Sequence, residues 1–243
     1  MDPSKSHFKS RKLHSLLGVL PLGAFILEHL YTNAFVLGGQ SAYDRQVNWL
    51  LSLPKPVLYS LEIVFVAMPL LFHGILGAKI ALEGRSNVRD YPYVRNAAYM
   101  MQRWSGMYLL AFIVYHVWTT RFTGHFEYPA VGPVMASGGD LLGVGAVGDG
   151  SALVGSRSSI YYFMLDQLSA NWLLAIVYVL GVVAATFHFS NGLWTFCITW
   201  GITVGARAQR ISRYLFNALG VALLVLGTAS VIKLVLTPNP FRS

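Results

Sequence analysis

The sequence predicts an all-α integral membrane protein in which five helices form one bundle. Hydrophobic residues make up 55% of the 243 residues, charged residues make up only 12%, and the mean hydropathy is +0.53. A composition of this kind is typical of membrane proteins. Five segments also reach the roughly 20 residues that an α-helix needs to cross a bilayer. We expect a single membrane domain over residues 1–243.

The five predicted spans differ in character. The fourth is long enough to tilt or to project beyond the bilayer. The fifth has no histidine and little polarity, so helix packing is its expected role. Pro21 and Pro69 are expected to bend their helices. The predicted spans are Lys12–Phe35, Pro56–Leu82, Asn96–Thr120, Asn171–Val204 and Ser212–Leu236.

Basic residues predict the orientation in the membrane. The net charge of +8 could suggest a nucleic-acid partner, but the cations cluster between the apolar spans, so topology explains them better and no nucleic acid is expected. Excess Lys and Arg mark the cytoplasmic side, which places the amino terminus in the cytoplasm and the carboxyl terminus outside. Twelve cations lie on the inner side (Lys5, Lys9, Arg11, Lys12, Lys79, Arg85, Arg89, Arg95, Arg103, Arg207, Arg210, Arg213) and six on the outer side (Arg45, Lys55, Arg121, Arg157, Lys233, Arg242).

The longest connection runs from about residue 121 to 170 and is rich in glycine, notably at 137–140 and 143–150. It lacks the Gly-Lys-Ser/Thr ending and the following helix start of a phosphate-binding loop. We expect a flexible external loop. The basic amino-terminal stretch is followed by an apolar run without a small-residue cleavage site, so the first span is expected to be retained.

Four histidines lie in four different apolar spans: His29, His73, His116 and His188. An ionisable side chain in the hydrocarbon region is costly and usually marks a functional site. A single such histidine could be a satisfied packing residue, but one in each of four spans is harder to explain in that way. We interpret the four residues as the axial ligands of two bis-histidine haem sites.

The alternating direction of the spans sorts these histidines into pairs. His29 and His116 lie about 17 and 20 residues into spans that run outward, whereas His73 and His188 lie about 17 residues into spans that run inward. At about 1.5 Å per residue, the first pair lies toward the outer face and the second lies toward the cytoplasm. We therefore predict an outer haem between His29 and His116 and an inner haem between His73 and His188.

Two haems of b type are the cofactors that these residues favour. The lone Cys197 excludes an internal disulfide, a cysteine-ligated iron–sulfur cluster and covalent haem attachment through C-x-x-C-H. With both axial positions taken by imidazole, such a haem carries electrons and does not activate oxygen. A zinc or di-iron site would need ligands at one depth and usually several carboxylates. The spans contain few acidic residues, mainly Glu28 and Glu62.

Glycines follow two of the histidines at helical spacing. Gly77 and Gly192 come four residues after His73 and His188, so each shares a face with its histidine. The missing side chain could let the helix approach a flat macrocycle. Ordinary packing of small residues between helices is an equal alternative.

These motifs together resemble the dihaem cytochrome b membrane anchor of bacterial succinate:quinone oxidoreductases, the succinate dehydrogenases and fumarate reductases. The resemblance covers nearly the whole chain. Two departures are the long third connection and Thr186, where some fumarate-reducing members carry an acid, so a proton route through that point is not expected. The matching motifs are residues 11–19 with Pro21, Gly23 and His29, residues 61–62 and 69–74, residues 102–106 with His116, and residues 188–194.

The resemblance implies a five-helix anchor in the bacterial cytoplasmic membrane. A flavoprotein containing FAD and an iron–sulfur protein would bind its cytoplasmic face. Electrons would pass through the inner haem and then the outer haem to a membrane quinone, with menaquinone as the expected species. The alternative is a dihaem cytochrome b subunit of another respiratory dehydrogenase, such as a hydrogenase or formate dehydrogenase. A haem-free transporter with histidine proton relays is a third possibility, but we find no convincing internal repeat of the transporter kind.

Five further residues are candidates for binding roles. His14, Ser15 and Arg103 lie near the inner ends of their spans, where they could hold the propionates of the inner haem or serve topology. Glu62 lies 11 residues before His73, about 16 Å toward the outside, and is a candidate for quinone binding or proton transfer. Asp44, in the first external connection, is a second such candidate. Helix packing for Glu62 and a solvated loop charge for Asp44 are the simpler alternatives.

Overall fold

The computed structural model describes residues 3–84, 86, 88–122 and 160–240, and every regular element in these ranges is helical. The glycine-rich part of the connection, including residues 137–140 and 143–150, lies outside the described residues. The α-helices are α1 (Pro3–Val19), α2 (Pro21–Ala34), α3 (Gln40–Leu51), α4 (Lys55–Ser60), α5 (Met68–Glu83), α6 (Val94–Val117), α7 (Ile160–Ala170), α8 (Trp172–Thr199) and α9 (Ala206–Leu236). Three shorter elements are the 3₁₀ helix η1 (Phe35–Gly38) and the π-helices η2 (Leu61–Ala67) and η3 (Trp118–Phe122).

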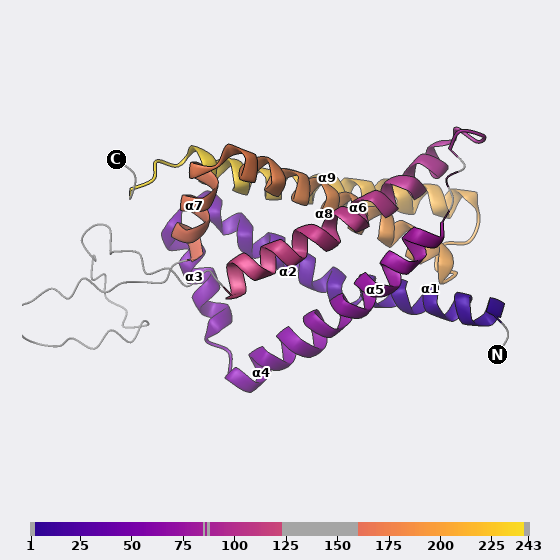
Figure 1. Cartoon of the computed structure of the whole chain (residues 1–243), viewed down its shortest axis with the longest axis horizontal. Helices are drawn as coiled ribbons and strands as arrows, with labels where there is room; N and C mark the ends of the chain where they lie inside the picture. The colour runs from indigo at the N-terminus through magenta and orange to yellow at the C-terminus, as the bar shows by residue number, and fades with distance from the viewer. Residues whose placement is uncertain (1–2, 85, 87, 123–159, 241–243) are drawn as a thin grey trace, which may run out of the picture.

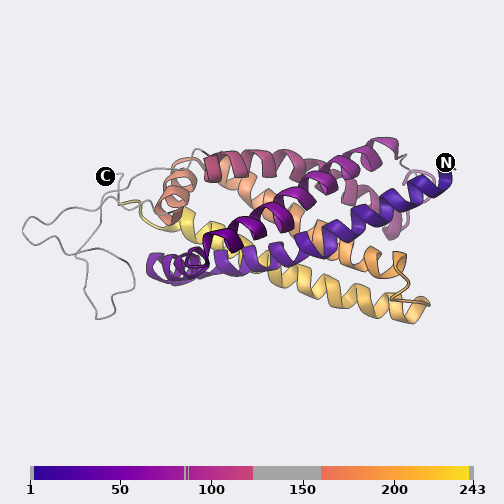
Figure 2. The ribbon, with the colours of Figure 1, turned by 90° about the horizontal axis from the view of Figure 1, so that it is seen from below.

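The long helices run side by side along one axis (Figures 1 and 2). α1 begins at one end of the bundle, whereas α3 and α7 lie at the other end, beside the last turns of α9 (Figure 1). α8 and α9 form an antiparallel pair, and α8 also packs against α6 and α1. The bundle therefore brings all four histidine-bearing segments into contact with a neighbour that bears another histidine.

Within the described residues, four helical segments are long and apolar enough to cross a membrane: Phe8–Gly38, Lys55–Glu83, Trp172–Thr199 and Ala206–Leu236. They match the first, second, fourth and fifth predicted spans. The third predicted span corresponds to α6, which has 24 residues but carries Arg95 and Arg103 and is less apolar. The crossing of the membrane by α6 stays a prediction.

Both prolines that we expected to bend helices lie at irregular points. Pro21 starts α2 directly after the break at Leu20, which separates α2 from α1. Pro69 lies in the first turn of α5, directly after the π-helical segment η2. Because proline has no amide hydrogen and clashes with the preceding turn, the helical hydrogen bonds must rearrange there.

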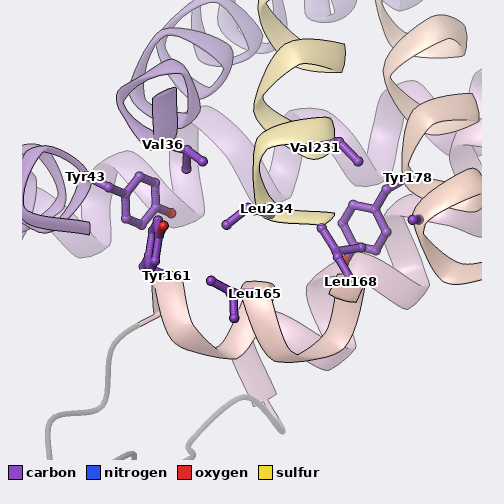
Figure 3. Close-up of a cluster of buried hydrophobic side chains, with 9 residues drawn as sticks. Val36, Tyr43, Tyr161, Leu165, Leu168, Tyr178, Val231 and Leu234 are labelled. Carbon is purple, nitrogen blue, oxygen red and sulfur yellow. The ribbon is translucent and has the colours of Figure 1, made fainter. Parts of the chain in front are cut away.

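Helix α7 is the best-buried part of the described chain, although the sequence led us to expect a loop there. Leu165 and Leu168 are each 1% exposed. They pack in a cluster with Val36, Tyr43 and residues of α8 and α9 (Figure 3). Over Ile160–Ala170 the flexible-loop expectation is therefore wrong, because apolar residues at helical spacing pack there against α3, α8 and α9.

Replacing Leu165 with alanine is expected to destabilise the protein by about 2–5 kcal/mol, since it leaves a cavity where the cluster cannot fully collapse. Leu51→Ala on α3 is the matched control, because Leu51 is 60% exposed and exposed sites tolerate change. Thermal unfolding of the purified protein in detergent measures both. Equal melting temperatures for the two variants would contradict the packing role of α7.

Candidate functional site

The structure brings the four intramembrane histidines together as two pairs, drawn from four helices. His29 of α2 and His116 of α6 have ring centroids 5.9 Å apart, with an angle of 80° between the ring planes. His73 of α5 and His188 of α8 have centroids 6.1 Å apart and an angle of 85°. We call the first two residues the outer pair and the second two the inner pair. These are the same partners that the direction of the spans predicts.

The distances within the pairs suit a shared metal ion. Imidazole–metal bonds are about 2 Å long, so two rings that bind one ion from opposite sides have centroids roughly 6 Å apart. All four histidines also keep part of their surface exposed in the protein, which leaves area that a macrocycle could cover. Within the described residues, no three His, Cys, Asp or Glu side chains gather as a metal site. Two imidazoles in each pair match the two axial ligands of a haem b, and the number of haems stays a prediction.

Hydrogen bonds orient both rings of the inner pair. The Nδ1 atom of His73 lies 2.9 Å from the carbonyl oxygen of His14, and that of His188 lies 3.1 Å from the carbonyl oxygen of Gln102. A carbonyl only accepts, so in each ring Nδ1 carries the proton and donates it. The lone pair then lies on Nε2, which is the tautomer that a metal-binding histidine needs.

The outer pair has a more aromatic environment. The Nδ1 atom of His116 lies 3.2 Å from the hydroxyl of Tyr178. The rings of Phe112 and Phe25 stack on His116 and His29, at centroid distances of 5.7 and 5.3 Å. These contacts hold the rings in place and surround the outer pair with apolar surface.

Two independent helices give the separation of the pairs along the bundle. Gly18 lies against the ring of His73, and His29 follows it by 11 residues on the same span. Gly106 lies against the ring of His188, and His116 follows it by 10 residues on α6. At 1.5 Å per residue, α6 places the outer pair roughly 15 Å from the inner pair, and the α1–α2 stretch, which is interrupted at Leu20, gives a similar length.

Of the three residues predicted to hold propionates, His14 contacts the inner pair. The ring of His14 stacks on that of His73, with centroids 3.9 Å apart. The Ser15 hydroxyl accepts a hydrogen bond of 3.1 Å from the indole of Trp200. Arg103 donates to the hydroxyl of Tyr99, and its Nε atom is buried without a partner among the described residues. A propionate role stays a prediction for all three.

Glu62 and Asp44 have different partners. Glu62, in η2, forms a 2.8 Å ion pair with Arg121 of η3, and Arg121 follows His116 by five residues. Glu62 therefore lies toward the outer pair. Asp44 accepts a 3.1 Å hydrogen bond from the side-chain amide of Gln40, and the Oε1 atom of the same amide accepts one of 2.7 Å from the hydroxyl of Tyr162.

A phenol outside the spans lies beside Asp44. Tyr43 faces Tyr161 at a centroid distance of 6.1 Å (Figure 3). Burial, together with the negative charges of Asp44 and Glu28, raises the pKa of Tyr43 to about 12. The phenol therefore stays protonated, and able to donate a hydrogen bond, across the physiological pH range.

No protein-family model matches the chain. The chain is 36% identical over 228 residues to the succinate dehydrogenase cytochrome b558 subunit of Bacillus subtilis (strain 168), and the match covers 94% of this chain and 97% of that relative. Identity at this level along nearly the full length of both proteins is decisive. The chain belongs to the succinate dehydrogenase cytochrome b family. The resemblance stated from the sequence motifs is thereby confirmed, and family membership supports both the membrane-anchor role and a place within an enzyme complex.

Sequence reasoning missed several polar residues that this cytochrome b chain places around its histidines. Gln102 and Ser105 contact His188, and Tyr178 contacts His116. Gln102, Ser105 and Gly106 follow the spacing i, i+3, i+4, so they share one helical face. That spacing could have marked the face, but not the partner helix, which lies more than 80 residues away in the sequence.

Proposed function

We propose that this chain is the dihaem membrane anchor that passes electrons between a flavoprotein/iron–sulfur succinate dehydrogenase or fumarate reductase and membrane quinone. The observation that carries the proposal is the pairing of four histidines from four helices at distances that suit one metal ion each. Family membership supplies the context of the complex. When bound between two imidazoles, haem b supplies one-electron transfer without an open iron position.

The residues of this chain would serve that transfer by position. His73 and His188 would hold the inner site, with the predicted cytoplasmic cation Lys79 six residues after His73 on α5, while His29 and His116 would hold the outer site. Backbone carbonyls keep both inner rings in the ligating tautomer. The flavoprotein and iron–sulfur partners would bind the cytoplasmic face, and quinone would bind at the outer end. The chain would lie in the cytoplasmic membrane with its amino terminus inside.

The purified complex is expected to contain two non-covalent haems b per copy of this chain, because each histidine pair fits one. Haem extracted into acidic acetone, measured against protein mass, gives the ratio. Identification of the co-purified subunits separates a succinate dehydrogenase from a hydrogenase or formate dehydrogenase. One haem or none per chain would overturn the proposal.

Glu62 is our first candidate for proton transfer to quinone, and Asp44 is the second. Glu62→Gln is expected to slow quinone reduction by about 100-fold, the lower end of what a positioned acid or base contributes, with both haems retained. Quinone reduction by succinate in membranes, with haem content from the same sample, measures this.

Glu83→Gln is the matched control for Glu62→Gln. Glu83 ends the same helical segment, Lys55–Glu83, forms an ion pair with Lys79 at 3.9 Å, and its side chain is 42% exposed against 40% for Glu62. It lies at the opposite end of that segment, so its removal is expected to leave quinone turnover unchanged. Normal turnover in Glu62→Gln would remove that residue from the proposal.

A further inference from the structure

The two helices that present the inner pair each form a reciprocal contact with a neighbouring helix. In the first contact, the Nδ1 atom of His73 donates to the carbonyl of His14 at 2.9 Å, and the Nδ1 atom of His14 donates to the carbonyl of His73 at 3.1 Å. Each residue thus bonds the backbone of the other. This ties α1 to α5 at one level of the bundle.

The second contact, between α6 and α8, has the same form. The Nδ1 atom of His188 donates to the carbonyl of Gln102 at 3.1 Å, and the Nε2 atom of Gln102 donates to the carbonyl of His188 at 3.0 Å. Asn191 donates to the amide oxygen of Gln102 at 2.8 Å, which sets the orientation of that amide. Gln102 therefore takes the place in this contact that His14 takes in the first.

A glycine four residues further along makes room for each ring of the inner pair. A side chain on Gly18, four residues after His14, would collide with the ring of His73. A β-carbon on Gly106, four residues after Gln102, would lie 3.0 Å from Cε1 of His188. In both contacts, a backbone carbonyl accepts from Nδ1 of the histidine, and the glycine one helical turn later leaves space for the histidine ring.

The other two glycines complete the repeat. A β-carbon on Gly77, four residues after His73, would lie 2.8 Å from Cε1 of His14. One on Gly192, four residues after His188, would lie 3.6 Å from Nε2 of Gln102. Gly77 and Gly192, which the sequence analysis considered as space for a macrocycle, instead face the neighbouring helix. Helix packing therefore explains both glycines in this structure.

One difference between the two contacts bears directly on the ring of His188. Ser105 is 7% exposed, and its hydroxyl lies 3.1 Å from the Nδ1 atom of His188 and 3.1 Å from the carbonyl of Gln102. Since the hydroxyl donates to that carbonyl, its oxygen accepts from Nδ1–H. The corresponding position in the first contact, three residues after His14, is Leu17, which offers no acceptor. His188 thus donates to two oxygens.

We propose that this repeated helix-pair clamp holds the two inner-haem histidines and that Ser105 is a positioning residue that makes His188 the stronger electron donor of the two. A hydrogen-bond acceptor at Nδ1, the ring nitrogen that does not bind the metal, raises the basicity of a metal-bound imidazole. A more basic axial ligand favours the oxidised iron. Ser105 thereby lowers the reduction potential of the inner haem. This inference rests on the proposed function, since it needs haem at the inner pair.

The test compares Ser105→Ala with Ser190→Ala in the whole complex. Ser190 is equally buried and lies two residues from His188, but its hydroxyl bonds Phe187 of its own helix. Redox titration followed by absorbance resolves the two haems, and electron paramagnetic resonance reports the ligand field of each. Ser105→Ala is expected to raise the inner midpoint potential and shift the inner resonance, with the outer haem unchanged. Ser190→Ala and Ser105→Thr, which keeps a hydroxyl, are expected to match the wild type.

A pair of glycine variants tests the clamp itself. Gly106→Ala is expected to alter the inner resonance, because the new methyl group would press on the ring of His188. Gly192→Ala is the control on the facing helix, since its methyl group would meet Gln102 only at ordinary contact distance. If Ser105→Ala does not accumulate, Ser105→Cys replaces it, because a thiol is a weak acceptor, and the same upward shift is expected.

The outcomes separate this inference from the proposed function. Two haems per chain with an unchanged inner potential and resonance in Ser105→Ala would overturn the role of Ser105 and leave the proposed function standing. Unchanged inner resonance in Gly106→Ala would overturn the clamp. Wild-type complex with fewer than two haems would overturn the proposed function itself.

Discussion

Alanine in place of His73 or His188 is expected to remove the inner haem, while the outer haem stays at full occupancy. Each variant leaves one imidazole where two are needed. His29→Ala and His116→Ala are expected to remove the outer haem in the same manner. Redox-resolved absorption spectra of the four purified variants show which component each has lost.

His14→Ala tests the predicted propionate contact separately from axial ligation. Its ring stacks on His73, but His73 bonds the backbone carbonyl of residue 14, which alanine keeps. Both haems should therefore remain in His14→Ala. The pairing would be wrong if the His29 and His73 variants lost the same component. Loss of the inner haem from His14→Ala would show that its ring contributes to binding.

Four of the five predicted spans match helical segments long and apolar enough to cross a membrane, because a bilayer imposes a simple rule on length and polarity. The predicted fourth span began at Asn171, which proves to be the cap of α8, with its side chain accepting from the amide of Leu174 at 3.2 Å. The fifth began at Ser212, six residues after the start of α9. This rule identifies only the apolar part of a helix. It therefore does not include polar first turns in a predicted span, such as the first turns of α9 that carry Arg207 and Arg210.

Helix α7 and the π-helical segments could not be predicted by that rule. α7 has 11 residues, too few to cross a bilayer, and its apolar pattern acquires meaning only from the surface of α3, α8 and α9 that it covers. The π-helices η2 and η3 are joined by the ion pair between Glu62 and Arg121. Their wider turns arise from packing and from the proline that follows η2, neither of which has a periodic signature in sequence.

The candidate site divides in the same way. The cost of burying a histidine in the bilayer predicts which histidines bind haem, and span direction predicts their partners. The structure brings the same rings into contact, while their role as haem ligands stays a prediction. The residues that accept hydrogen bonds from the histidine Nδ1 atoms could not be predicted. Two of these acceptors are backbone carbonyls, and the side chains of His14 and Gln102 do not reveal that their carbonyls lie beside a histidine ring. Glycine spacing could be seen in the sequence, but its purpose needed the helix opposite.

Collapse of the membrane potential is expected to slow electron transfer from succinate to quinone. Electrons would enter from the cytoplasmic side, cross the two sites roughly 15 Å apart along the bundle, and reduce quinone near the outer end, where Glu62 and Arg121 lie. Protons would be taken up on that side. Two electrons moving outward in this way release about 4.6 kcal/mol per 100 mV of inside-negative potential, from about 2.3 kcal/mol for each charge.

That release is large enough to offset an unfavourable step from succinate to a low-potential quinone, so the rate should fall when an uncoupler is added. Proteoliposomes that hold the whole complex, energised to an inside-negative potential, allow the measurement. Succinate oxidation by a water-soluble dye on the cytoplasmic side is the control, because those electrons never cross the bilayer and should be insensitive to uncoupler. A quinone rate equally insensitive to uncoupler would place the quinone site on the inner side and exclude Glu62 as its proton donor.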